Sequence, residues 1–229
     1  SIQGRWDEAE EQYDHALPIA VKHKLTTPLA RIYSSRADLA VKKGEMDNAL
    51  SLHKKALEMQ IKLRDAQGAA RSYNNMGYIF RRQRDNKRAI EVYGNVEELL
   101  ESEDSPDLTE ARIRLASAFL EMGEMDRARD HAMKAHDETA ENNQEKLHAR
   151  SRAVLGRYYA RIKDNDLAMH HYTGALEILS DQSDPRSAVE VEILLGQVLS
   201  DAGSTEEAAQ HYLDALSIAE ANDFRMMQG

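Results

Sequence analysis

The segment 73–88 carries the side chains with the clearest chemistry in this sequence. It opens with Asn74 and Asn75, within YNNMGYIF (73–80), and an asparagine amide can both donate and accept hydrogen bonds. It continues into RRQRDNKR (81–88), which is dense in arginine. A guanidinium fork matches carboxylates and phosphates. These residue types favour recognition of a ligand, although a cationic run at a turn between helices is also consistent with simple solvation.

The elements that position these residues repeat along the chain. One alanine position recurs at intervals of 39 or 40 residues, and its surroundings recur with it, as in GEMDNALSLHKKAL (44–57) and GSTEEAAQHYLDAL (203–216). Self-similarity at this period is typical of stacked-repeat proteins. The position is occupied by Ala9, Ala49, Ala89, Ala128, Ala168 and Ala208.

Each repeat reads as two helices. In residues 27–43, apolar residues recur at three- and four-residue steps, which places them on one helical face. Gly44 follows as a helix-terminating glycine, and residues 45–63 then continue with the same spacing. Alternating β-branched residues, which would indicate strands, are missing. The sequence therefore predicts an all-α fold.

The pattern resembles the tetratricopeptide repeat over nearly the whole chain. A small residue recurs in each first helix, at Ala37, Gly77, Ala116, Gly156 and Gly196. An aromatic slot recurs in each second helix, at Tyr13, His53, Tyr93, Ala132, Tyr172 and Tyr212, where His53 and Ala132 are expected to weaken their interfaces. The 40-residue period is similar to that of kinesin light chains, Pins-type adaptors and bacterial signalling regulators. The resemblance implies a right-handed α-solenoid of antiparallel helix pairs with about eleven helices.

The resemblance also divides the chain into units. Residues 1–29 match the second half of a truncated repeat, and full repeats follow at 30–69, 70–108, 109–148, 149–188 and 189–228. Neither end resembles the polar cap that a repeat array requires. We therefore expect either a piece of a longer array or self-association through the ends.

In this family the first helices line a concave groove in which ligands bind. Matching each unit to the motif gives an arginine-rich groove that also includes the asparagine pair and a tyrosine, within a chain of net charge −10. The resemblance implies that these residues bind a peptide, and their charge favours an acidic or phosphorylated one. The candidate groove residues are Arg71, Asn74, Asn75, Tyr78, Arg81, Arg82, Arg114, Arg150, Arg157 and Arg161.

Chaperone-binding members of the family hold a terminal carboxylate in a clamp of five residues. Asn75 and Arg114 match that clamp, whereas Ser34, Asp38 and Glu110 occupy its other three positions. Two of these three are acidic and would repel a carboxylate. The resemblance therefore argues against a chaperone clamp and leaves Asn75 as a hook for some other peptide backbone.

Nothing in the sequence predicts catalysis, a cofactor or a metal site. It contains no Gly-rich phosphate loop, HExxH or GxSxG, and it has no cysteine. His131, His171 and His211 occupy one column of the repeat. Equivalent helices of adjacent units lie on the order of 10 Å apart, whereas zinc holds its nitrogen ligands at about 2 Å. These histidines cannot share one ion, and we predict that the protein is not an enzyme.

The composition of the chain bears on which classes of partner and which cellular compartment to expect. No apolar run approaches the length of a membrane span, and a net charge of −10 argues against nucleic acid as a partner. The absence of cysteine fits a cytoplasmic protein. We predict a scaffold that binds an extended or helical acidic peptide of a partner protein. Two alternatives stay open: a ligand-sensing or regulatory segment of a multidomain signalling or transcription regulator, and self-association through uncapped ends.

Overall fold

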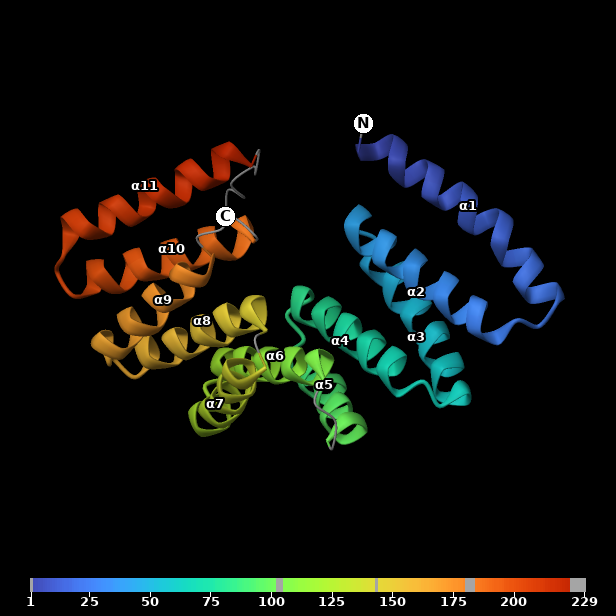
Figure 1. The fold of residues 1–229 in the computed structure, drawn as a ribbon, viewed down its shortest axis with the longest axis horizontal. Coiled ribbons are helices and arrows are strands. Elements are labelled where there is room, and N and C mark those ends of the chain that lie inside the picture. The colour runs from blue at the N-terminus through green and yellow to red at the C-terminus, as the bar shows by residue number, and fades with distance from the viewer. Residues whose placement is uncertain (1, 102–104, 143, 180–183, 223–229) are drawn as a thin grey trace. The chain divides into compact units, whose positions relative to one another are not determined.

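The structure is a computed structural model that describes residues 2–101, 105–142, 144–179 and 184–222. Eleven helices and no strand occur in these residues, which confirms the all-α class. The chain divides into two compact units, residues 1–111 and 112–229. Within each unit, successive helices fold back beside one another through short turns (Figure 1).

The first unit holds five complete helices and the beginning of a sixth. These are α1 (Ile2–Lys22), α2 (Thr26–Lys43), α3 (Met46–Leu63), α4 (Ala66–Arg82), α5 (Asn86–Leu100) and the first turns of α6 (Pro106–Met122). The second unit holds the remainder of α6 and five further helices. They are α7 (Met125–Glu141), α8 (Glu145–Arg161), α9 (Asn165–Leu179), α10 (Pro185–Asp201) and α11 (Thr205–Ala221).

The turns follow from local sequence chemistry. Gly44 ends α2 with φ 82°, the left-handed conformation that glycine adopts without steric penalty, and its N–H bonds to carbonyls of the last turn. Asp65, Asp85 and Asp184 precede helices, and each side chain accepts a hydrogen bond from a backbone N–H of the first turn. The chain therefore reverses direction at positions that the sequence marks.

The recurring alanine lies where helices pack closely. It is fully buried at Ala49, Ala89, Ala128 and Ala168, and nearly so at Ala208. Small side chains at these positions let the helix axes approach, because ridges of one helix pack into grooves of the next. The 40-residue period of the sequence is therefore a period of helix contacts.

The small and aromatic positions of each repeat meet across a helix pair. A Cβ atom added at Gly156 would lie 2.5 Å from the ring of Tyr172, and one added at Gly196 would lie 2.7 Å from the ring of Tyr212. Gly77 faces Tyr93 in the same way. The rings therefore occupy the space that the missing glycine side chains leave.

Two pairs depart from this glycine–tyrosine pattern. His53 and Ala132 take the place of the tyrosine, and the small position in their pairs is Ala37 or Ala116. All four residues are fully buried. Both pairs therefore lie in the core, and the weakening expected from His53 and Ala132 stays a prediction.

In the described residues, no helix is long and apolar enough to cross a membrane.

Candidate functional site

A hollow of about 430 Å³ opens in the first unit between α2 and α4, with α3 at its base. We call it the α2–α4 groove. Two first helices of successive repeats form its walls, and the intervening second helix forms its floor. It is lined by Thr27, Ala30, Arg31, Ser34, Ser35 and Asp38 of α2, by His53, Gln60 and Leu63 of α3, by Asp65, and by Arg71, Ser72 and Asn75 of α4.

Gln60 holds the floor of the groove to both walls. Its Oε1 accepts a hydrogen bond of 2.7 Å from the Ser72 hydroxyl, and its Nε2 donates to Ser34 Oγ at 3.4 Å. Gln60 and Ser72 are buried. Because these polar groups are satisfied internally, they set the position of α4 against α2 and leave the rim residues to meet a ligand. The sequence analysis missed Gln60, whose only signal is a polar residue on the buried face of α3.

Asn75, the residue predicted to bind a peptide backbone, already has a hydrogen-bond partner on the α2 wall. Asn75 Nδ2 donates a 3.0 Å hydrogen bond to Asp38 Oδ1. Burial raises the pKa of Asp38, and the nearby Lys42 partly offsets that rise. His53 Nε2 lies 3.7 Å from the same carboxylate oxygen, and burial lowers the pKa of His53 to about 4, so the ring is neutral near pH 7. A peptide that bonds to Asn75 must therefore compete with Asp38.

Arginine supplies the positive charge of this groove. Arg31 on α2 and Arg71 on α4 are both exposed. Arg71 Nη1 lies 3.5 Å from Asp107 Oδ2, yet the Arg71 side chain remains 60% exposed. Solvent around the exposed guanidinium screens its attraction to the half-buried Asp107 carboxylate. The Arg71 guanidinium can therefore turn toward an incoming carboxylate at small cost.

Asn74 points away from the groove. It is buried, and its Nδ2 donates a 2.8 Å hydrogen bond to the backbone carbonyl of Asp107, at the beginning of α6. The amide therefore ties α4 to the next helix. Adjacent residues on a helix point about 100° apart, which explains why only one member of the asparagine pair lines the groove.

The other predicted residues of α4 lie toward its C-terminal end. Tyr78 and Arg82 are exposed and Arg81 is half-buried. None of the three lines the α2–α4 groove. They extend a polar surface along α4 beyond the hollow.

The remaining predicted arginines belong to the second unit. Arg114 lies on α6, and Arg150, Arg157 and Arg161 lie on α8. Arg157 Nη2 is 3.9 Å from Glu121 Oε1, so this arginine is oriented by a glutamate of the preceding repeat. Arg161 is exposed at the end of α8, whereas Arg114 and Arg150 are half-buried.

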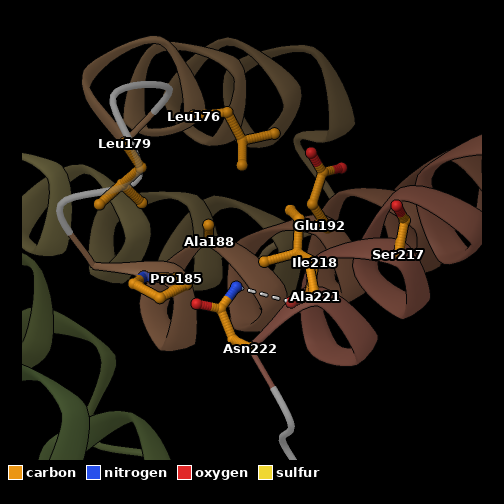
Figure 2. A pocket seen from close by; sticks show the side chains of 9 residues that line it. All are labelled: Leu176, Leu179, Pro185, Ala188, Glu192, Ser217, Ile218, Ala221 and Asn222. Carbon is orange, nitrogen blue, oxygen red and sulfur yellow. Dashed lines mark hydrogen bonds between the residues drawn. The ribbon is translucent and has the colours of Figure 1, made fainter.

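A second hollow, of about 310 Å³, opens in the second unit among α9, α10 and α11. Figure 2 shows aliphatic side chains on several sides and the Glu192 carboxylate at its margin. We call it the α9–α11 hollow. It is lined by Leu176, Leu179, Pro185, Ala188, Glu192, Ser217, Ile218, Ala221 and Asn222.

Comparison with protein families agrees with the helix pairs. Models of the tetratricopeptide repeat match residues 28–102, which span α2 to α5, and residues 193–222, which include α11. Both stretches of the chain are tetratricopeptide repeats. No curated protein sequence gives a significant match.

Solved structures share this tetratricopeptide-repeat fold at low sequence identity. BtubC (BKLC) from P. vanneervenii has a TM-score of 0.77 at 22% identity, covering 100% of this chain and 95% of that one. A putative kinesin light chain from Podospora anserina has a TM-score of 0.64 at 16% identity, with coverages of 85% and 96%. The Rap conjugation gene regulator of the plasmid pLS20, in complex with the Phr* peptide, has a TM-score of 0.73 at 17% identity, with coverages of 89% and 56%. These likenesses confirm the expected fold.

Proposed function

We propose that this tetratricopeptide-repeat protein is a non-catalytic scaffold that binds an extended acidic segment of a partner protein in the α2–α4 groove. One observation carries the proposal: two exposed arginines, Arg31 and Arg71, stand on the two helices that flank a 430 Å³ hollow. Arginine forks hold carboxylates through two parallel hydrogen bonds. A segment with acidic side chains could therefore engage both walls.

The groove also offers groups for a peptide backbone. Ser34, Ser35 and Asn75 line it and can each donate or accept hydrogen bonds. Because Gln60 joins the floor to both walls, the groove is formed before a ligand arrives. A preformed site loses little conformational entropy on binding.

The comparisons support a peptide as the ligand class. The Rap regulator of pLS20 has a similar fold and was solved with the Phr* peptide. This chain covers 56% of that protein, so the likeness supports peptide binding as a class and leaves the site to be argued from the groove itself. The acidic character of the peptide follows here from Arg31 and Arg71.

Charge reversal tests the proposal. An array of unstructured peptides with stepwise increasing glutamate content is screened by fluorescence anisotropy against the intact chain and an Arg31→Glu/Arg71→Glu variant. We expect affinity to rise with glutamate content and to fall at least about tenfold in the variant, a change of about 1.4 kcal/mol. Added salt should weaken binding by the intact chain.

Arg82→Glu is the matched control for Arg71→Glu alone, because both make the same charge change on an exposed arginine of α4 and only Arg71 lines the groove. It should retain at least half of the affinity. An equal loss in Arg82→Glu would point to general electrostatic attraction by the basic surface, and binding that ignores glutamate content would overturn the acidic-peptide proposal.

Self-association is a second candidate, favoured by an apolar surface on α11. Tyr212, Leu213 and Leu216 are all more than a third exposed there. Light scattering over a concentration series should show a rising mass that Leu213→Lys abolishes, and a constant monomer mass would exclude this route. The ligand-sensing or regulatory role in a signalling protein stays a prediction.

A further inference from the structure

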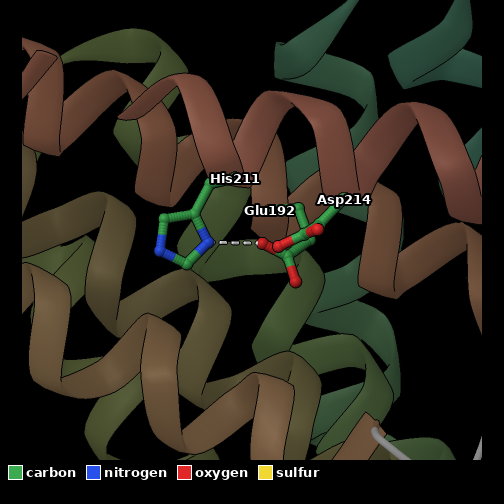
Figure 3. A group of neighbouring side chains, drawn as sticks. All are labelled: Glu192, His211 and Asp214. Atoms are coloured by element: carbon green, nitrogen blue, oxygen red, sulfur yellow. Dashed lines mark hydrogen bonds and ion pairs between the residues drawn. The ribbon is translucent and has the colours of Figure 1, made fainter. Parts of the chain in front are cut away.

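Three potential metal ligands come together between α10 and α11. Glu192 lies on α10, and His211 and Asp214 lie on α11 (Figure 3). His211 Nδ1 is 2.7 Å from Glu192 Oε2, and one ligand atom from each residue lies within 4.8 Å of the others. The Glu192 side chain is only 12% exposed, so its carboxylate is held inside the helix pair.

The helix pair fixes this cluster in place. His211 and Asp214 are three residues apart, which puts them on one face of α11. Tyr212, next to His211, packs over Gly196, and Gly196 lies one helical turn after Glu192 on α10. The close glycine–tyrosine crossing therefore brings the Glu192 carboxylate opposite the two residues of α11.

The positions equivalent to Glu192 and Asp214 carry no carboxylate in the preceding repeats. Arg152 takes the place of Glu192 in the preceding repeat, where its side chain fills the space over Gly174. Arg112 takes that place one repeat earlier and forms an ion pair with Glu138. Only the histidine is common to all three repeats. The three sets, 40 residues apart, are Arg112, His131 and Lys134; Arg152, His171 and Gly174; and Glu192, His211 and Asp214.

We propose that Glu192, His211 and Asp214 bind a divalent transition-metal ion, with Zn²⁺ as the best match. An imidazole nitrogen with carboxylate oxygens is a ligand set that zinc accepts, whereas calcium and magnesium favour oxygen ligands alone. Three protein ligands leave one tetrahedral position for water or for a group of a bound molecule.

The surroundings suit such an ion. Gln210 Nε2 donates a 2.9 Å hydrogen bond to Asp214 Oδ1, and a partner of this kind orients a ligating carboxylate. Glu192 also lines the α9–α11 hollow, so the ion would stand beside a space of about 310 Å³. A small ligand group entering that space could reach the open position.

Isothermal titration with ZnCl₂, and with CoCl₂ followed by its visible absorption, tests the site in the intact untagged chain. We expect one equivalent of metal to bind and the Co²⁺ spectrum to show a tetrahedral nitrogen–oxygen environment. Glu192→Gln/Asp214→Asn keeps the size of both side chains and should weaken binding at least about 100-fold, while Gln210→Ala should weaken it about tenfold.

His170→Gln is the control, because His170 is exposed on α9 and belongs to the preceding repeat. It should leave the stoichiometry and affinity unchanged. Absence of Zn²⁺ binding by the intact chain would show that the cluster is held by its hydrogen bonds alone. Binding that survives in the double variant would place the ion elsewhere, and either result overturns the proposal.

Discussion

Two successive groups of three helices in the second unit have the same backbone arrangement but different side chains between the helices. We call them the α7–α9 layer and the α9–α11 layer. In the α7–α9 layer, His136, His148, Arg152 and His171 lie together, with the rings of His136 and His148 stacked at 4.8 Å. In the α9–α11 layer, positions 40 residues later carry Leu176, Ala188, Glu192 and His211, and the first three of these line the 310 Å³ hollow. The same repeat position is thus packed in one layer and open in the next.

The comparison shows that the repeat determines where helices cross, whereas individual side chains determine whether the space between repeats is filled. Both layers keep the glycine–tyrosine crossing, at Gly156 and Tyr172 and at Gly196 and Tyr212. Replacing rings by smaller side chains then opens a hollow without changing the crossing. Since a structural layer and a candidate site differ only in such replacements, the comparison can be tested by substitution.

The largest expected effect comes from filling the buried crossing. In Gly156→Ala, the new methyl would lie 2.5 Å from Tyr172, whose ring is 1% exposed and cannot move aside. Overpacking of about 3 kcal/mol should outweigh a helix-propensity gain of about 1 kcal/mol. We expect a loss of about 2 kcal/mol in the free energy of unfolding, measured in urea.

Gly196→Ala is the matched change in the open layer. The Tyr212 ring is 39% exposed and can shift outward, so the free energy of unfolding should stay within about 0.5 kcal/mol of the parent. Equal losses in the two variants would show that exposure of the tyrosine does not distinguish the layers.

The second-largest effect is expected from acidification, which should destabilise the α7–α9 layer. Burial, together with the nearby Arg152, His136 and His170, lowers the pKa of His171 to about 4. Unfolded histidine titrates near 6.5, so between these values the unfolded chain binds more protons and stability falls as pH decreases. We expect a loss on the order of 1 kcal/mol between pH 6.5 and pH 4.5, because partial exposure reduces the effect.

Arg152→Gln sharpens this second test. Arg152 also lowers the pKa of His136 and His148, so its removal should raise all three pKa values and flatten the pH dependence of the melting temperature. Burial lowers the pKa of His53 in the first unit as well, and that contribution should persist in the variant. An unchanged pH profile would contradict coupling between Arg152 and the ring cluster.

Much of the fold could be predicted because the repeat places equivalent residues at equivalent contacts. The helix end at Gly44 follows from the glycine itself, and the small and aromatic positions follow from the resemblance to the tetratricopeptide repeat. The structure pairs three of these positions as glycine–tyrosine crossings.

The sites were less predictable because they depend on directions of single side chains. Alignment to the repeat motif predicts both Asn74 and Asn75 in the groove, and Asn75 lines it. Because successive residues on a helix point about 100° apart, Asn74 instead faces Asp107.

The sequence sets His131, His171 and His211 in one column whose members are too far apart to share an ion. His211 instead lies near Asp214 of its own helix and Glu192 of the facing helix. The three-residue step to Asp214 marks one helical face, whereas the contact with Glu192 depends on how the two helices pack.

The smallest expected effect comes from filling the open layer. Ala188 is 6% exposed and lines the α9–α11 hollow, so Ala188→Leu should bury new apolar surface there and stabilise the fold by about 0.5–1 kcal/mol. Ala149→Leu is the control, because Ala149 is fully buried in α8 and the larger side chain should destabilise the fold by about 1–3 kcal/mol. A loss in both variants would mean that the hollow is too constrained to accept a side chain. A gain in Ala188→Leu alone would show that the open layer forgoes available stability, which is the pattern expected of space kept for a ligand.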